Sequence, residues 1–373
     1  MLIGKKLAKL RKELGLTKTK LSKISSIDVK TIRLIETSKR TPMKETLVKI
    51  RVGIKKEFGL DISDVIGKIV WDLKDLGRVT LSIIEGSLLG DGSISKDGIY
   101  TQQAKDGKYL QWLAKLLTKR GVHCTVIPTK HKSGFSKSKD FWQLYSHTCP
   151  ALADLRKKWY IRYRGKTLKI VPPDIKIIPV TLLHWYLGDG SFKRDFRSDQ
   201  IVRPYVRLHS LGFTREDIKL LIDKLGETGL EFISVPKLSY KKKFGYDLYS
   251  EQDSVFTFFK IIGLFPIKGI EGCITRIVTT RGKVYKFKDK WPTKEDWLRI
   301  LPQIDKIGLV IGERREILGM SQSALARVVG TVSHHICQIE SGKKHPSSSL
   351  FKRLLLALQF DIKDVLGELA PLR

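Results

Sequence analysis

The chain has 373 residues, enough for two or three domains with their own hydrophobic cores. Its 70 Lys and Arg side chains against 38 Asp and Glu give a formal net charge of +32, which predicts a polyanionic partner. The sequence has no apolar run long enough for a membrane span, no signal segment and only four scattered cysteines, so we expect an intracellular protein without membrane partner, disulfide framework or zinc site.

The N-terminal segment, residues 1–67, has the pattern of a small helical module. Thr17 can cap a short helix, and after a turn a second helix is expected to begin near Asp28. This order resembles the helix-turn-helix of phage repressors, in which the second helix enters the major groove. The resemblance makes basic residues of these two helices DNA-binding candidates, namely Lys18, Lys30 and Arg33. The segment holds 17 basic and 7 acidic side chains, a net charge of +10, which favours phosphate contacts.

After a predicted linker, residues 68–79, the first of two similar motifs begins. It reads Ile84-Glu-Gly-Ser-Leu-Leu-Gly-Asp91-Gly92, and the other reads Leu182-Leu-His-Trp-Tyr-Leu-Gly-Asp189-Gly190. Each is an apolar helical run closed by Gly-Asp-Gly, so each delivers one carboxylate to a helix end. Two such helices packed side by side would hold the two carboxylates next to each other. Adjacent carboxylates repel unless a cation lies between them, and hard oxygen ligands suit Mg²⁺.

These motifs resemble those of the LAGLIDADG homing endonucleases of the single-chain, two-motif type. The N-terminal motif is similar to the family's GxLLGDG variant. The C-terminal motif is similar to its WFMDDGS variant, with Gly188 where an Asp often stands. The resemblance covers roughly residues 80–280, because flanking segments are similar as well: Lys169-Ile-Val-Pro172, Pro179 and His209-Ser-Leu-Gly-Phe-Thr214.

The resemblance implies an α+β core with a pseudo-twofold axis. Its two αββαββα-like halves, residues 80–170 and 171–278, are expected to join through the motif helices. Hydrophobic patterning agrees, since it predicts alternating strands and helices in a similar order after each motif. We expect a monomer.

The resemblance also assigns roles to residues of the site. It implies that divalent metal, Mg²⁺, is held by the two motif carboxylates and two backbone carbonyls, those of Asp91, Asp189, Gly90 and Gly188. It implies a basic residue in each half, Lys169 in the first and Arg276 in the second, where Lys is usual. Gln102 resembles a polar residue near the family's site, whereas Leu211 stands at the corresponding place of the second half. We therefore expect two active sites of unequal rate.

One strand of the second half predicts a DNA-binding face. Between Val202 and His209, apolar residues alternate with a row made of Arg203, Tyr205, Arg207 and His209. Arg and His can donate to base edges in the major groove, so this row is expected to line a DNA groove. A solvated basic face is the alternative. Pro204 inside the strand indicates an edge or a bulge.

The chain ends by repeating its beginning. After a basic linker, residues 279–300, the final segment 301–373 aligns with the N-terminal module, residues 15–42 on 319–346 without gaps. The resemblance to phage repressors then makes three residues DNA-binding candidates: Gln322, Ser333 and His334. With 10 basic and 7 acidic side chains, a net charge of +3, this module is expected to be a weaker DNA binder or a packing module.

These observations together predict a site-specific homing endonuclease that cuts double-stranded DNA and serves intron mobility. We expect it in the cytoplasm, associated with the nucleoid. Two alternatives stay open: a non-cleaving transcriptional regulator on the same scaffold, and an intron-splicing maturase that binds intron RNA. The presence of both motif aspartates counts against the first, and nothing in the sequence excludes the second.

Overall fold

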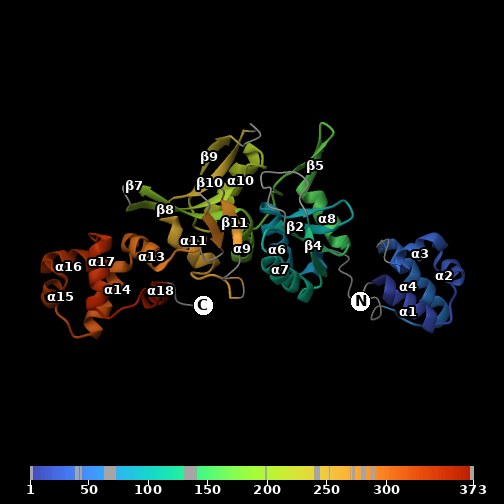
Figure 1. Ribbon diagram of the computed structural model, residues 1–373, viewed down its shortest axis with the longest axis horizontal. Coiled ribbons are helices and arrows are strands. Elements are labelled where there is room, and N and C mark those ends of the chain that lie inside the picture. The colour runs from blue at the N-terminus through green and yellow to red at the C-terminus, as the bar shows by residue number, and fades with distance from the viewer. Residues whose placement is uncertain are drawn as a thin grey trace. The chain divides into compact units, whose positions relative to one another are not determined.

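Two α/β halves of the same element order occupy the middle of the chain, and a helical module lies at each end (Figure 1). The computed structural model describes residues 3–37, 42, 44–62, 73–129, 141–197, 200–238, 244–251, 253–268, 270, 274–278, 283–286 and 290–369. The chain divides into two units, Met1–Pro172 and Pro173–Arg373, each with one helical module and one α/β half. Among these described residues no helix has the length and apolar character of a membrane span.

The first half has the order αββαββα. Its elements are α6 (Arg78–Leu89), β1 (Ser93–Ile94), β2 (Tyr100–Ala104), α7 (Gly107–Lys119), β3 (Cys124–Thr129), β4 (Phe141–Ser146) and α8 (Pro150–Trp159). The 3-10 helix η1 (Leu73–Leu76) precedes them, and a hairpin of β5 (Tyr160–Tyr163) and β6 (Lys166–Lys169) follows. The strands form an antiparallel sheet in the order β1-β2-β4-β3. Asp106 caps α7, whose apolar face packs on this sheet.

The second half repeats this order. Its elements are α9 (Pro179–Asp189), β7 (Gly190–Arg197), β8 (Gln200–His209), α10 (Arg215–Gly226), β9 (Phe232–Leu238), β10 (Phe244–Ser250) and α11 (Ser254–Ile262). A hairpin of β11 (Ile274–Val278) and β12 (Lys283–Lys286) follows. The sheet order is β7-β8-β10-β9, and a capping box of Thr214 and Asp217 starts α10. The α+β fold class and the two αββαββα halves predicted from the sequence are therefore confirmed.

Strand register shows how closely the halves correspond. Ser93 pairs with Thr101 in the first sheet, and Ser191, which follows Asp189 by the same two residues, pairs with Arg207 in the second. The amide of Tyr100 donates to Ser146 Oγ at 2.8 Å, and the amide of Val206 donates to Ser250 Oγ at 2.9 Å. The same side-chain bond therefore occurs at matching positions of both sheets.

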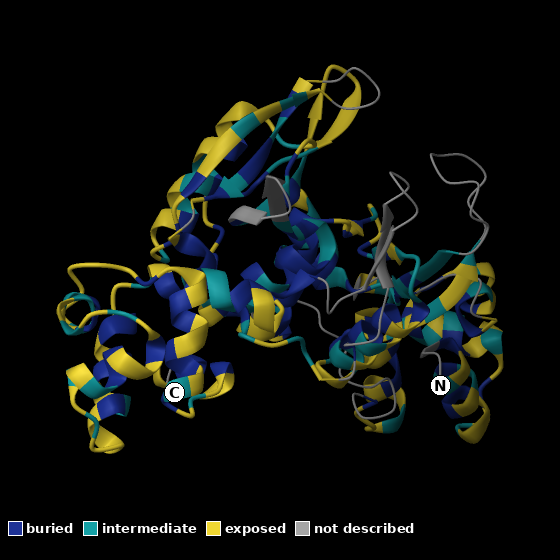
Figure 2. Cartoon of the chain, turned by 60° about the vertical axis from the view of Figure 1, so that its left-hand side comes forward, coloured by how far each residue is buried: buried dark blue, intermediate teal, exposed yellow. Residues whose placement is uncertain are grey.

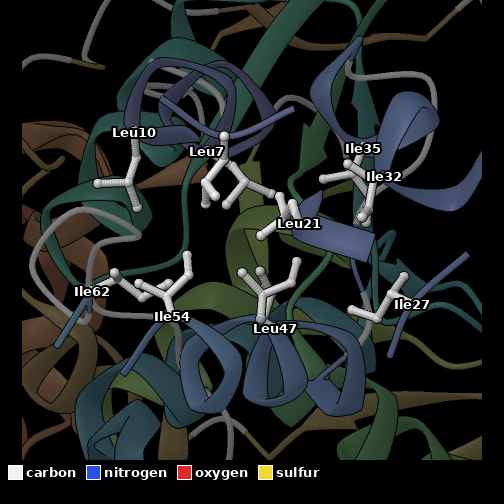
Figure 3. Packing of buried hydrophobic residues seen from close by; sticks show 11 residues of the cluster. Leu7, Leu10, Leu21, Ile27, Ile32, Ile35, Leu47, Ile54 and Ile62 are labelled. Atoms are coloured by element: carbon white, nitrogen blue, oxygen red, sulfur yellow. The ribbon is translucent and has the colours of Figure 1, made fainter. Parts of the chain in front are cut away.

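The N-terminal module is a four-helix unit around its own apolar core. Its helices are α1 (Ile3–Glu13), α2 (Lys18–Ser25), α3 (Val29–Glu36) and α4 (Lys44–Phe58). Figure 3 shows Leu7, Leu21, Ile32, Leu47 and Ile54, from all four helices, pointing toward one another. Thr17 and Asp28 cap α2 and α3, so both predicted helix starts are confirmed.

The C-terminal module has the same design. Its helices are α13 (Lys294–Ile300), α14 (Ile307–Ile317), α15 (Gln322–Val329), α16 (Ser333–Glu340), α17 (Ser348–Ala357) and α18 (Ile362–Leu369), with the 3-10 helix η2 (Leu301–Gln303) after α13. In each module one buried or nearly buried arginine bridges two helices: Arg11 Nε lies 2.6 Å from Glu36 Oε1, and Arg315 Nε lies 2.7 Å from Glu340 Oε1. Since these pairs occupy aligned positions, the internal repeat extends to buried ion pairs. In both modules buried residues gather on the inner helix faces (Figure 2).

The C-terminal module is packed on the second half. Trp291 and Trp297 are almost fully buried, and the Trp297 ring packs edge-on against Phe256 and Phe259 of α11. Trp291 Nε1 donates to the carbonyl of Gly263 at 2.8 Å. The segment 279–300 was predicted to be a basic linker. From residue 290 onward it instead contributes buried aromatic side chains that pack between α11 and the C-terminal module.

Candidate functional site

Both Gly-Asp-Gly motifs lie at the C-terminal ends of buried helices. α6 ends at Leu89 and Asp91 follows it, whereas Asp189 is the last residue of α9. Asp91 is exposed and Asp189 is partly exposed, although most residues of both helices are buried. Each motif therefore places one solvent-accessible carboxylate at the end of a largely buried helix. The approach of Asp91 to Asp189, which belong to different units, stays a prediction.

The glycine after each aspartate is needed for close packing. A Cβ on Gly92 would lie 2.6 Å from the Ser87 carbonyl oxygen, and one on Gly190 would lie 2.5 Å from the Tyr186 carbonyl oxygen. The backbone amides of both glycines donate to these same carbonyls. The chain thus turns back tightly against the last helical turn, which fixes where the aspartate is held.

Lys169 binds the end of the first motif helix. Its Nζ donates to the carbonyls of Leu88, Gly90 and Gly92 at 2.7, 3.2 and 3.0 Å. The C-terminal end of a helix carries partial negative charge, so a cation is favourable there. The predicted basic residue of the first half therefore lies beside Asp91, and the Gly90 carbonyl, a predicted metal ligand, accepts one of its bonds.

Lys290 has the same place in the second half. Its Nζ donates to the carbonyls of Tyr186 and Leu187 at 3.0 and 2.9 Å and lies 5.5 Å from the centre of the Tyr186 ring. The Tyr186 hydroxyl donates back to the Lys290 carbonyl. Leu88 and Tyr186 each stand three residues before the motif aspartate, so Lys169 and Lys290 cap equivalent helix ends.

Lys290 was not among the residues predicted from the sequence, where the basic residue of the second half was expected to be Arg276. The Arg276 side chain lies outside the described residues, so that assignment stays a prediction. A weak signal for Lys290 was present, because a proline follows it by two residues in Lys290-Trp-Pro292, much as a proline follows Lys169 by three residues in Lys169-Ile-Val-Pro172.

Gln102 lies under the sheet instead of on its open face. It is 2% exposed, accepts from the Tyr100 hydroxyl at 2.5 Å and donates from Nε2 to the Tyr109 hydroxyl at 3.3 Å. Burial, and the nearby charge of Asp91, raise the pKa of Tyr100 and Tyr109, so both phenols stay neutral. Gln102 therefore belongs to a buried polar chain next to Asp91.

The second half replaces this chain by an apolar contact. Gly190 pairs with Leu208 in the second sheet. In the first sheet Ser93 pairs with Thr101, so the same register places Gln102 opposite Gly92, the counterpart of Gly190. The counterpart of Gln102 is therefore Leu208, which is fully buried, and not Leu211 as the sequence suggested. The two sites still differ in this polar group.

The open face of the second sheet carries the predicted DNA-binding row. Val206 and Leu208 of β8 are fully buried, while Tyr205, Arg207 and His209 are partly exposed on the opposite face. The side chain of Arg203 lies outside the described residues. Pro204 lies where β8 pairs with β7 alone, next to a β-bulge of β7, so it is both near a bulge and on an edge-like stretch.

A buried carboxylate binds two side chains of this row. Asp247 of β10 is fully buried, and its Oδ2 accepts from Arg207 Nε at 2.9 Å and from a second guanidinium nitrogen. His209 Nδ1 lies 3.5 Å from Asp247 Oδ1. Burial alone would raise the pKa of Asp247, but the hydrogen bonds and charges of His209 and Arg207 outweigh it and lower that pKa to about 2. Arg207 is therefore held in a fixed orientation by an ionised partner.

The helix-turn-helix candidates fall into two groups. Lys30 and Arg33 of α3 and His334 of α16 are exposed, and Ser333 is partly exposed at the start of α16. Lys18 and Gln322 instead reach the buried ion pairs: Lys18 Nζ lies 4.0 Å from Glu36, and Gln322 Nε2 donates to Glu340 at 2.8 Å. The first group is available to DNA, and the second also holds the module together.

Comparisons with known proteins match two parts of the chain. Residues 81–258 match the LAGLIDADG DNA endonuclease family, and residues 7–55 match a helix-turn-helix family. The chain is similar to the uncharacterized protein MJ1098 of Methanocaldococcus jannaschii, at 26% identity over 225 residues, 60% of this chain and 82% of that protein. A solved structure, the homing endonuclease I-WcaI bound to its DNA recognition sequence, is 19% identical with a TM-score of 0.40, covering 56% of this chain and 91% of that one.

Proposed function

Because residues 81–258 belong to the LAGLIDADG DNA endonuclease family and residues 7–55 form a helix-turn-helix, we propose that the chain is a site-specific endonuclease that cuts both strands of duplex DNA. The observation that supports this most is a constellation that occurs twice. At the end of each motif helix, one aspartate stands beside a lysine ammonium bound to the last helical carbonyls. A double-strand break requires hydrolysis of two phosphodiester bonds, one in each strand, and each bond would be served by one aspartate and its lysine.

The donor atoms at each motif fit Mg²⁺. Among the described residues there is no group of three or more His, Cys, Asp or Glu side chains that would bind a metal alone. Mg²⁺ is commonly held by one or two carboxylates together with water and substrate phosphate. Asp91 with the Gly90 carbonyl, and Asp189 with the Gly188 carbonyl, would hold it in this way. When bound, Mg²⁺ supplies an activated water and stabilises the leaving oxygen.

The lysines are proposed to act on the phosphate. An ammonium tied to three or two helix carbonyls is oriented before DNA arrives, so it needs no reorganisation as charge develops on the scissile phosphate. Lys169 serves this purpose beside Asp91, and Lys290 serves it beside Asp189. Gln102 and its tyrosine partners support Asp91 from beneath, and this support has no polar equivalent at Leu208.

DNA binding is proposed to use the open sheet faces and the end modules. Arg207 offers a cation and His209 an imidazole on the second sheet, and the tilted rings of Tyr205 and Tyr249 lie 5.1 Å apart beside them. The N-terminal module, with a net charge of +10, contributes contacts to phosphates. The C-terminal module contributes α16, whose exposed His334 faces away from the module core.

Two other functions use the same scaffold. A non-cleaving transcriptional regulator would bind the same DNA without cutting it, and a maturase would bind intron RNA. Two exposed or partly exposed motif aspartates, each next to a bound lysine, favour the endonuclease, because neither alternative needs both groups.

The test is cleavage of a randomised library of long duplexes in Mg²⁺. The proposal expects double-strand breaks at one sequence that disappear in EDTA. Enrichment of one bound sequence without any break would indicate the regulator, and preferential binding of structured RNA would indicate the maturase.

A further inference from the structure

The β5–β6 hairpin of the first half is exposed along its entire length beyond its base. All eight residues from Ile161 to Leu168 are exposed, and the hairpin extends away from its half (Figure 1). An isolated two-stranded hairpin is only marginally stable in water, so its conformation depends on its base. This element has no part in the core.

The base of the hairpin is firmly attached. Trp159 is fully buried, and its carbonyl accepts from the amide of Ile170 at 2.8 Å. The Tyr160 hydroxyl accepts from the amide of Ile94 at 3.3 Å, and the Arg156 guanidinium lies 4.1 Å from the centre of the Tyr160 ring. The fold therefore holds the hairpin in a defined direction while leaving its surface uncovered.

Composition indicates what the surface contacts. The segment from Tyr160 to Lys169 has four basic side chains and no acidic one. It also exposes Ile161, Tyr163 and Leu168, with exposed fractions of 42%, 53% and 37%, and the Arg164 guanidinium lies 5.2 Å from the centre of the Tyr163 ring. Exposed apolar side chains on a projecting element mark a contact surface. Charge complementarity selects a polyanion as the partner.

Register connects this surface to Lys169. Tyr160 pairs with Lys169 and Arg162 pairs with Thr167, so Arg162 and Lys169 lie on one face of the hairpin. Two residues along a strand span about 6.8 Å, which is about the axial rise of two nucleotides in one DNA strand. A phosphate backbone that meets Lys169 at the end of α6 therefore meets Arg162 within about two nucleotides.

We propose that the β5–β6 hairpin is a DNA-binding arm that grips the phosphate backbone beside the bond served by Asp91. Arg162 supplies the contact on the face of Lys169, and Arg164 and Lys166, at and next to the turn of the hairpin, supply contacts from its tip. Since Lys169 is the last residue of β6, binding of the arm also fixes the strand that carries this lysine. The inference rests on the proposed function, because it places the arm next to the cleavage site.

The test compares two triple variants with the same loss of charge. The first replaces Arg162, Arg164 and Lys166 by Gln, and the control replaces Lys108, Lys115 and Lys119 by Gln. The control residues are exposed on α7, whose opposite face packs on the sheet. Binding of the full chain to a duplex of random sequence is measured by fluorescence anisotropy in EDTA over a KCl series, with thermal unfolding as the folding check.

Each phosphate contact contributes a slope of about −0.9 in log K against log salt. The arm variant is therefore expected to lower the slope magnitude by about 2 to 3, and Arg162→Gln alone by about 1. The control triple should lower it by less than about 1, and both triples should unfold at the wild-type temperature.

The proposal that the hairpin is a DNA-binding arm would be refuted if both triple variants had the same salt slope, or if the slope of the arm variant equalled that of the wild type. The same is true if the arm variant loses affinity for duplex RNA but not for duplex DNA. Because EDTA removes cleavage from the assay, a wild-type chain that never cuts DNA would defeat the proposed function and leave this result standing. A chain that cuts normally with an unchanged slope in the arm variant would defeat only the arm.

Discussion

Replacing Lys290 by Met is expected to slow cleavage of one DNA strand while DNA binding stays nearly unchanged. Met keeps the apolar stem but lacks the ammonium that donates to Tyr186 and Leu187. Removing one preorganised electrostatic group costs about 10²–10³ in rate. We therefore expect the strand served by Asp189 to be cut on the order of 10² more slowly, and the other strand to be nicked at nearly the wild-type rate.

The same substitution should lower the stability of the second unit. Lys290 is 7% exposed, so without its ammonium the carbonyls of Tyr186 and Leu187 lose a hydrogen-bond donor that water cannot easily replace. Hydrogen bonds to charged groups contribute about 1.5–3 kcal/mol, and a cation at a helix C-terminus about 0.3–1 kcal/mol. A loss of about 2–3 kcal/mol corresponds to a melting temperature roughly 4–12 °C lower. Cleavage is therefore measured well below the onset of unfolding.

The assay is single-turnover cleavage at saturating protein, with the two strands labelled separately. Arg276→Met is the informative comparison, because the family resemblance assigns to Arg276 the role that is proposed for Lys290. A larger rate loss for Arg276→Met than for Lys290→Met, at equal DNA binding, would refute the equivalence of Lys290 and Lys169.

Three further predictions concern other parts of the chain. Lys169→Met should slow cleavage by on the order of 10² without changing metal dependence; a wild-type rate would remove Lys169 from the site. Deleting residues 1–67 should lower the salt slope of DNA binding by about 3 to 5 units, and deleting 301–373 by less, so equal shifts would contradict the charge asymmetry. Asp247, with its pKa lowered to about 2, should stabilise the fold by roughly 2 kcal/mol above pH 4 and lose this as pH falls toward 2. Denaturant unfolding of Asp247→Asn should lack that pH dependence.

Much of the architecture was predictable because it depends on local patterns. Two apolar runs closed by Gly-Asp-Gly, with strands and helices in the same order after each, predict two equivalent halves. Thr17 and Asp28 predict the starts of α2 and α3 through side-chain caps. These signals act over a few residues, so they are visible in one sequence.

What the sequence did not reveal depends on contacts between distant segments. Lys290 meets Tyr186 across 104 residues, and no local pattern specifies which lysine reaches that helix end. The burial of Asp247 beside Arg207 and His209 follows from cross-strand register, which no local pattern reveals. Residues 279–300 were expected to form a basic linker, and only the packing of Trp291 and Trp297 on α11 shows that this segment attaches the C-terminal module.

The most direct test of metal-dependent cleavage by Asp91 and Asp189 is to replace each by Asn and measure cutting and binding on the same selected duplex in Mg²⁺. Each carboxylate is proposed to hold metal and not to touch bases, so both variants should bind with nearly the wild-type affinity and make no double-strand breaks. A nick confined to one strand in one variant would agree with unequal half-sites. Full double-strand cleavage by either variant would contradict the account.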